Sequence, residues 1–195
     1  MVSVFSHREC HLARIYVWMA GGFEHALALG AQDVSDALGR TDFAVDLGAR
    51  FGMHAIPLAR SGARVLAIDT SELLLAELRA QCRGLDVETV YADLLTFPDH
   101  LSERPDLILC MSDTLTHLRD MAQIAALLKA VFSALRPGGR FIATFRDYTR
   151  LPTGPDRFSP CAAIRIGSTP AFSRRCSATS SFTMSSTNAR PTPGR

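Results

Sequence analysis

Short apolar segments alternate with helix-like segments along most of the chain. Five segments are rich in apolar residues and bounded by turn residues: 43–48, 64–69, 87–92, 106–111 and 140–145. Helical spacing of apolar residues is found between them, at 53–60, 72–83 and 117–135. Apolar strands that lack in-and-out alternation are buried on both faces, which is typical of parallel sheets. The pattern predicts an α/β fold, a doubly wound and mostly parallel sheet with helices on both faces.

Residues 1–41 precede this alternation and have helical content. Apolar residues follow helical spacing at first, the pair Gly21-Gly22 interrupts the pattern, and a second helical stretch starts at Phe23. We therefore expect two lead-in helices. They either pack on the sheet as ordinary amphipathic helices, or form a lid in which Tyr16, Trp18 and Phe23 exclude water from a site beneath.

One carboxylate stands at or just past the end of each of the first four predicted strands: Asp46, Asp69, Asp93 and Asp113. Ligands of doubly wound sheets bind beyond the carboxyl ends of the strands, where the strand order reverses. These side chains therefore predict a site at that edge. The alternative for each one is an ordinary helix N-cap, since aspartate is common in such turns.

The turn after the first strand narrows the ligand class. Asp69 ends the strand that follows this glycine-bearing turn, and a carboxylate there can accept both hydroxyls of a ribose. Gly48 and Gly52 let the backbone approach such a ligand. In the fingerprint of dinucleotide-binding proteins this turn follows G-x-G-x-x-G, whereas the turn here has Gly48 and Gly52 only. Asp46 before the first glycine suits the ammonium group of a methionine moiety better than a pyrophosphate, which favours S-adenosylmethionine.

Several motifs stand at these strand ends and turns. They are Val45-Asp-Leu-Gly48 with Gly52, Val65-Leu-Ala-Ile-Asp69, Ala92-Asp93, the segment 106–118 and Leu135-Arg-Pro-Gly-Gly139. Together they resemble class I S-adenosylmethionine-dependent methyltransferases over about residues 42–148. The resemblance implies a Rossmann-like methyltransferase fold. The segment 112–117 is similar to that of small-molecule methyltransferases acting on amines, which implies a small-molecule acceptor.

The resemblance also implies roles for the matching residues. The cofactor-binding set is Asp46, Gly48, Ala49, Gly52, Asp69, Thr70, Asp93, Leu94, Met111 and Ser112. In this set the residues of the first turn hold the methionine part, and Asp69 holds the ribose hydroxyls. Asp93 takes the adenine amino group, with Leu94 against the ring, and the residues after the fourth strand line the pocket.

Catalysis needs little from the protein, because the sulfonium is already activated and alignment of the reactants can suffice. A general base is needed only where the acceptor arrives protonated, and Asp113, His117 and Tyr148 are the candidates. The resemblance implies that Asp113 and His117 face the transferred methyl group. His117 can equally be a water-exposed residue at a helix N-terminus.

Two positions depart from the family pattern near the proposed ligand. Arg50 stands where a third glycine is usual, and its side chain would either turn to solvent or occupy the methionine site. Ser112 replaces another usual glycine.

The composition limits the number of domains and the class of protein. The chain has 195 residues, 47% of them hydrophobic and 21% charged, which predicts one globular domain with room for a tail. No apolar run approaches the roughly 20 residues of a membrane helix, so we expect a cytoplasmic protein without membrane contact. The five cysteines form no CxxC pair, so neither a disulfide framework nor a metal site is expected.

Charge is uneven along the chain. Residues 159–195 hold five of the 21 basic residues and none of the 19 acidic ones, which leaves 16 basic against 19 acidic residues in 1–158. The mildly acidic body argues against a nucleic-acid partner. We expect a methyltransferase core at 42–158 and a disordered Ser/Thr/Arg tail at 159–195.

The tail has two interpretations. One is a frameshift near Phe158, because a neighbouring reading frame can encode amphipathic strands and the usual C-terminal strands of the fold are then missing. The other is a disordered arginine–serine tail that binds a partner. Without further strands, residues 140–145 form an open sheet edge that invites self-association.

Three functions follow from these patterns. The first is S-adenosylmethionine-dependent methyl transfer to a small molecule, an amine by analogy. The second is a catalytically impaired nucleotide-binding or interaction protein on a degraded methyltransferase fold, which Arg50 and the unusual C-terminus favour. The third is an NAD(P)-binding Rossmann protein.

Overall fold

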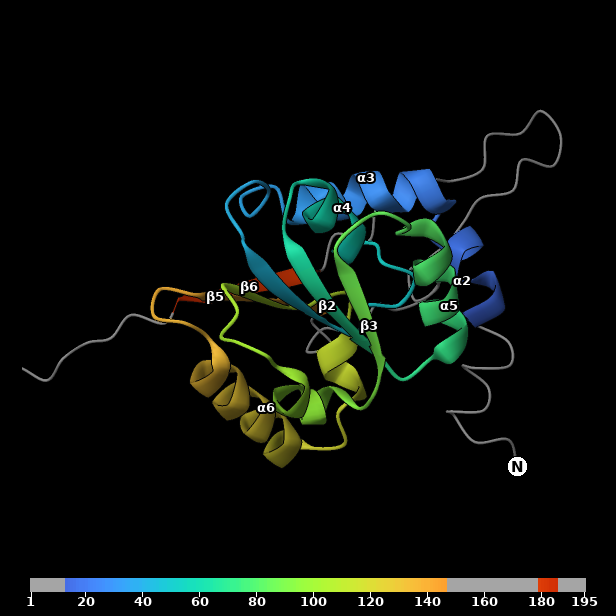
Figure 1. The fold of residues 1–195 in the computed structure, drawn as a ribbon. Helices are drawn as coiled ribbons and strands as arrows, with labels where there is room; N and C mark the ends of the chain where they lie inside the picture. Colours follow the sequence, from blue (N-terminus) through green and yellow to red (C-terminus); the bar gives the residue numbers. More distant parts are fainter. Residues whose placement is uncertain (1–12, 147–178, 186–195) are drawn as a thin grey trace, which may run out of the picture.

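The computed structural model of the chain describes residues 13–146 and 179–185 (Figure 1). Its strands are β1 (Phe43–Leu47), β2 (Arg64–Asp69), β3 (Val87–Tyr91), β4 (Leu107–Cys110), β5 (Arg140–Arg146) and β6 (Thr179–Ser185). They form one six-stranded sheet in the order β3-β2-β1-β4-β5-β6. The first five strands are parallel, and the order reverses between β1 and β4. The predicted doubly wound sheet is therefore confirmed.

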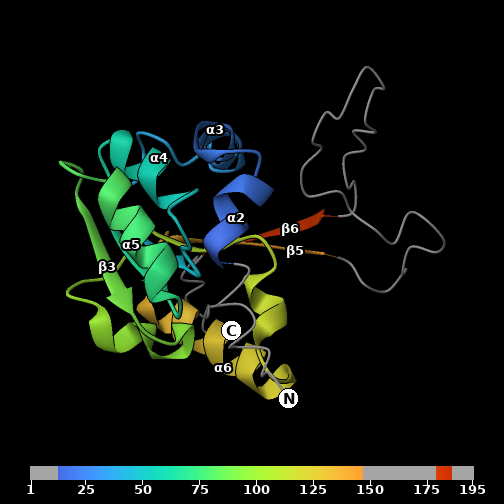
Figure 2. The same cartoon turned by 90° about the vertical axis from the view of Figure 1, so that its right-hand side faces the viewer.

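Helices cover both faces of this sheet (Figure 1). They are α2 (Ala13–Met19), α3 (Phe23–Asp33), α4 (Ala55–Arg60), α5 (Glu72–Gln81) and α6 (Met121–Ala134), with 3-10 helices η2 (Leu94–His100) and η3 (Thr114–His117). On one face, Leu58 of α4 and Leu78 of α5 pack on the sheet. On the other face, Leu127 of α6 and Phe97 of η2 do so. Figure 2 shows α2 beside α5, and the two helices are in contact.

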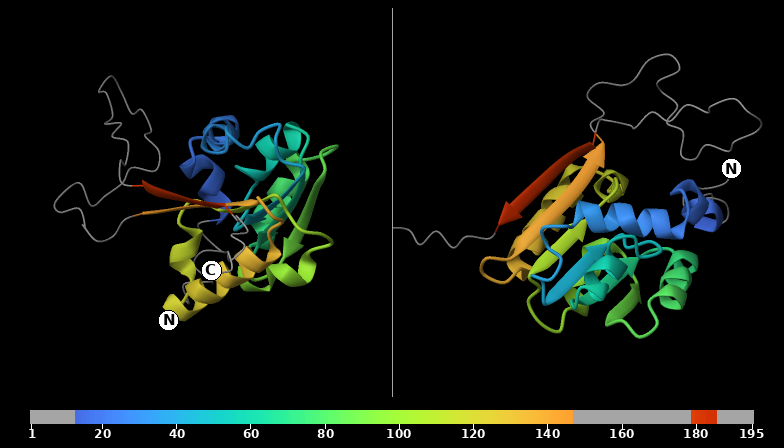
Figure 3. Two further views of the ribbon diagram at one scale, coloured as in Figure 1. Left: turned by 90° about the vertical axis from the view of Figure 1, so that its left-hand side faces the viewer. Right: turned by 90° about the horizontal axis from the view of Figure 1, so that it is seen from above.

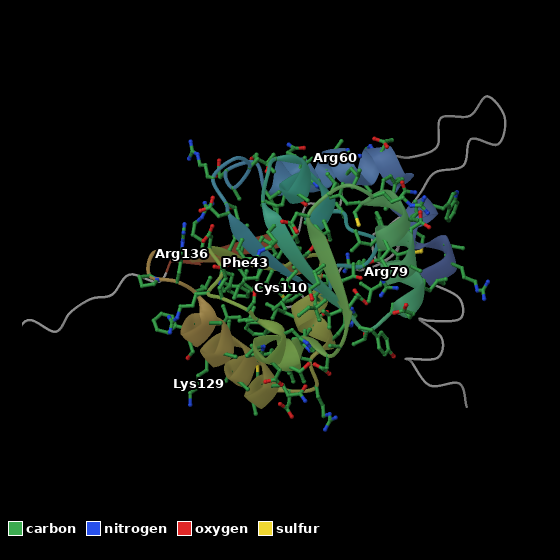
Figure 4. All side chains as sticks on the ribbon, viewed as in Figure 1. Phe43, Arg60, Arg79, Cys110, Lys129 and Arg136 are labelled. Carbon is green, nitrogen blue, oxygen red and sulfur yellow. The ribbon has the colours of Figure 1, made fainter. Side chains whose placement is uncertain are left out.

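Burial on both faces extends to the thiol of Cys110 in β4. Figure 4 shows Cys110 inside the molecule, whereas Arg60, Arg79 and Lys129 lie on its outside. Burial raises the pKa of the Cys110 thiol to about 12, so this group stays protonated and uncharged at neutral pH.

Most predicted elements agree with the structure, and the differences have local causes. The break at Gly21-Gly22 is confirmed, because α2 ends and α3 begins around these two glycines, which both have positive φ. The helix expected at 117–135 begins only at Met121, because the Asp120 carboxylate accepts the N–H of Gln123 at 2.9 Å and caps α6 there. The short helix η2 was not predicted, since its apolar residues show no helical repeat.

The sheet has a sixth strand where none was expected. β6 pairs antiparallel with β5 along its whole length, from Arg140↔Ser185 to Arg146↔Thr179 (Figure 3). The expected open edge at 140–145 is therefore wrong, because both sides of β5 are paired, and self-association through it loses its basis. Backbone hydrogen bonds drive this pairing, so it needs no continuous apolar run. The frameshift origin of 159–195 stays a hypothesis.

No helix in the described ranges is long and apolar enough to cross a membrane. The cytoplasmic location and the absence of a nucleic-acid partner stay predictions.

The role of β6 can be tested by two truncations. A chain that ends at residue 185 retains β6, whereas one that ends at residue 178 exposes the backbone edge of β5. We expect the shorter chain to aggregate more and to unfold several degrees lower in thermal denaturation, with the longer one serving as the control. Equal midpoints and equal solubility would contradict this pairing.

Candidate functional site

A cleft lies at the carboxyl ends of β1 and β2, at the edge of the sheet where the strand order reverses. Six of its lining residues were singled out from the sequence: Tyr16, Gly48, Asp69, Thr70, Leu94 and His117. Arg50, which departs from the family pattern, lines it as well. The structure therefore brings parts of the first turn, the end of β2, η2 and η3 around one space.

Asp69 joins the first two turns at this edge. One of its carboxylate oxygens, Oδ2, accepts the backbone N–H of Arg50 at 2.8 Å, and Oδ1 accepts that of Ser71 at 2.9 Å. Each carboxylate oxygen can accept more than one hydrogen bond, so these two bonds alone do not saturate the group. Asp69 thus fixes the turn after β1 against the end of β2 while it lines the cleft.

The glycines of the first turn permit close packing. A Cβ atom at Gly48, which has φ +78°, would lie 2.6 Å from the Thr114 side chain, and one at Gly52 would lie 2.3 Å from Leu78. Gly48 therefore lets η3 approach the cleft. Gly52 packs against α5 and does not line the cleft.

Arg50 points into the site. Its Nη2 donates a hydrogen bond to the carbonyl oxygen of Ser112, beyond the end of β4, and its guanidinium carbon lies 5.1 Å from the centre of the Tyr16 ring. The side chain therefore does not turn to solvent, which was one of the two alternatives, but is half-buried and lies across the cleft. Its backbone has φ +53°, a conformation typical of glycine.

Strained backbone gathers at the same place. In the described residues, the non-glycine residues with positive φ are Arg50, Ser112 and Asp113. The backbone N–H groups of the latter two donate to the Thr144 hydroxyl at 2.7 Å and the Thr144 carbonyl at 3.2 Å. Such conformations cost on the order of 1–3 kcal/mol each and cluster at functional sites. β5 therefore holds the loop after β4 in a strained form beside the cleft.

Asp46 lies beneath the turn, 1% exposed, in β1. Neither of its carboxylate oxygens accepts a hydrogen bond of normal geometry from the described residues, although the nearby Ala55 amide slightly favours the charged form. Burial raises the pKa of this carboxyl above its ordinary value of 3.8, while His54 and Arg50 oppose the rise. The residue does not line the cleft.

The other expected residues lie outside the cleft lining. Asp93 caps η2, since its Oδ1 accepts the N–H of Leu95 at 2.8 Å, and this matches the N-cap alternative. Ala49 and Met111 are buried. Ser112 and Asp113 flank the cleft in the strained loop. Tyr148 lies outside the described residues.

Several lining residues had not been singled out as ligand contacts: Ala13, Ile68, Ser71, Leu74, Ala92 and Thr114. Ser71 was recognisable only as the N-cap of α5, where its hydroxyl accepts the N–H of Leu74. Trp18, expected in a lid, is 50% exposed and does not line the cleft, whereas Tyr16 does. Tyr16 packs against Phe51 with ring centres 6.1 Å apart, and through Ala13 and Tyr16 α2 forms part of the cleft wall.

No group of three or more His, Cys, Asp or Glu residues in the described part of the chain could hold a metal ion. The absence of a metal cofactor stays a prediction.

The fold is that of class I, S-adenosylmethionine-dependent methyltransferases, and residues 44–139 match the methyltransferase domain family. A similar solved structure is magnesium protoporphyrin IX methyltransferase from Synechocystis PCC 6803 with bound S-adenosylmethionine. It is 18% identical with a TM-score of 0.63, over 92% of this chain and 93% of that chain. This likeness establishes the fold.

Two curated relatives are more similar in sequence. Ubiquinone biosynthesis O-methyltransferase of Aeromonas salmonicida (strain A449) is 35% identical over 104 residues, 51% of this chain and 42% of that protein. Cypemycin N-terminal methyltransferase of Streptomyces sp. is 34% identical over 113 residues, 57% of this chain and 42% of that protein. The chain therefore matches less than half the length of both relatives.

Asp46 provides a test of the electrostatics beneath the site. A raised pKa means that ionisation of Asp46 costs folding free energy, and this cost grows as pH rises from about 3.8 to the folded-state pKa. Asp46→Asn removes the cost. We expect the stability of this variant, relative to the wild type, to increase over that range and then level off, as measured by urea unfolding at a series of pH values. A stability difference that is independent of pH would show that Asp46 has an ordinary pKa.

Proposed function

We propose that this chain binds S-adenosylmethionine in the cleft and transfers its methyl group to a small-molecule acceptor. The observation that carries the proposal is the position of Asp69, which lines the cleft at the switch point and also fixes the glycine-bearing turn. The match of residues 44–139 to the methyltransferase domain favours this cofactor over the NAD(P) alternative.

The nucleoside half of the ligand fits the β2 side of the cleft. We assign the ribose hydroxyls to Asp69, with Thr70 beside them, and the adenine ring to the apolar wall formed by Leu94 and Ala92. Asp93, exposed next to this wall, is our candidate for the adenine amino group.

The methionine half belongs on the β1 and β4 side. Gly48 lets the ligand approach the turn, while Ala49 and Gly52 shape that turn from behind. The carbonyl oxygen of Ser112 is an acceptor for an ammonium group, and Met111 packs beneath this loop. Asp46 adds negative potential from below whenever it is ionised.

S-adenosylmethionine supplies a methyl group on a positively charged sulfur, so the protein mainly has to orient the acceptor and exclude water. We propose that α2 closes the site through Tyr16, which lines the cleft. His117 also lines the cleft. His117, Asp113 and Tyr148 are our candidates for the group that accepts a proton from the methyl acceptor.

The acceptor is proposed as an amine, from the likeness of segment 112–117 to amine methyltransferases. The relatives include an O-methyltransferase and an N-terminal methyltransferase, so a hydroxyl acceptor is the second class to test. To test both classes, the chain is incubated with S-adenosylmethionine and panels of small amines and phenols. We expect S-adenosylhomocysteine to form with at least one of these acceptors.

Binding without methyl transfer is the second candidate function, and the position of Arg50 in the cleft favours it. Saturable binding without S-adenosylhomocysteine formation over a broad acceptor panel would support this candidate.

The role of Asp69 can be tested by calorimetry with S-adenosylmethionine. Asp69→Ala leaves two ribose hydroxyls without a charged acceptor, so we expect binding to weaken by roughly 1.5–3 kcal/mol. Asp69→Asn keeps one acceptor oxygen and should lose less. Because Asp69 also accepts two backbone N–H groups, the thermal midpoint of each ligand-free variant must be measured alongside.

Asp99→Asn, an exposed position in η2, controls for the loss of one negative charge. Unchanged affinity in Asp69→Ala would remove the contact on which the proposal depends.

A further inference from the structure

The position of the Arg50 side chain supports an inference that rests on the proposed function and goes beyond it. Its backbone is fixed at the base of the cleft, because its N–H donates to Asp69 at 2.8 Å. From this anchor the side chain crosses from the turn after β1 to the loop after β4. The charged head of an arginine near the surface usually extends into water. Here the contacts of the guanidinium keep the side chain in the cleft.

Two contacts hold the guanidinium. It donates to the carbonyl oxygen of Ser112, and it lies over the Tyr16 ring of α2, 5.1 Å from the ring centre. Partly desolvated cation–π contacts of this kind contribute to stability, as do hydrogen bonds from a charged donor. The half-buried side chain therefore links the helix that closes the cleft to the strained loop at its opposite side.

The position of these contacts matters because the carbonyl oxygen of Ser112 is the acceptor that we assigned to the ligand's ammonium group. A guanidinium and an ammonium are both positively charged donors, so they compete for this oxygen. The Arg50 guanidinium therefore occupies the position that we assigned to the ligand's ammonium group.

We propose that Arg50 is an exchangeable plug that selects ligands with an intact amino-acid end. When such a ligand enters, its ammonium replaces the guanidinium on the Ser112 carbonyl, and the displaced guanidinium pairs with the ligand's carboxylate. The planar fork of arginine matches a carboxylate with two parallel hydrogen bonds. A ligand without the amino-acid end gains neither interaction.

Calorimetry with two ligands tests the proposal on the full chain. S-adenosylhomocysteine carries the amino-acid end, and 5′-methylthioadenosine is a related nucleoside thioether that lacks it. For the wild type we expect at least about 100-fold tighter binding of S-adenosylhomocysteine, since two charge-assisted contacts distinguish the ligands. For Arg50→Gly we expect S-adenosylhomocysteine to bind about tenfold more weakly, and 5′-methylthioadenosine to bind as tightly as before or more tightly.

The variants are chosen to keep the fold. Glycine suits a residue with φ +53°, and Arg50→Asn, a second variant, also tolerates this conformation while removing the charge. Arg60→Gln, at an exposed position in α4, controls for the loss of one positive charge and should leave both affinities unchanged.

The results distinguish the plug from other roles. Tighter binding of both ligands by Arg50→Gly, to the same extent, would show that Arg50 only obstructs the cleft, and would overturn the proposal. An unchanged preference between the ligands would overturn it as well. If neither ligand binds the wild type or the variants, the proposed function itself fails and the plug fails with it.

Discussion

The site depends on the hydrogen bonds that the Asp69 carboxylate accepts. This carboxylate accepts backbone N–H groups from the turn after β1 and from the turn after β2, so it fixes these two turns relative to each other. Strand pairing places the residue there, since the register of β1 on β2 brings Leu47 beside Ile68 just before it. One side chain therefore fixes two turns and also lines the cleft, where we propose that the ribose binds.

Energetically unfavourable features gather at the same edge of the sheet. Asp46 is a buried carboxylate without a hydrogen bond of normal geometry, and Arg50, Ser112 and Asp113 have backbone conformations that suit glycine. The opposite edge is well paired: Asp106 accepts the N–H of Asp42 at 2.6 Å and binds the Arg136 side chain at 2.7 Å. Strained conformations of this kind cluster at functional sites, so their position agrees with a ligand site at this edge.

Features that depend on the local pattern of apolar and turn residues could be predicted from the sequence. The strand at 64–69, the break at Gly21-Gly22 and the position of Asp69 at a strand end all follow from periodicity and turn residues, and the structure agrees. The direction of Arg50 could not be predicted, because it depends on a carbonyl oxygen 62 residues away and on an aromatic ring in α2. The strand β6 was missed for a similar reason, since its pairing with β5 is a long-range contact between backbones.

The most direct test of the central claim is a crystal structure of the full chain with S-adenosylhomocysteine. The account predicts the ribose hydroxyls within hydrogen-bond distance of Asp69, the adenine against Leu94, and the ligand's ammonium on the Ser112 carbonyl. A ligand bound elsewhere on the protein, or a nucleoside that makes no contact with Asp69, would contradict it.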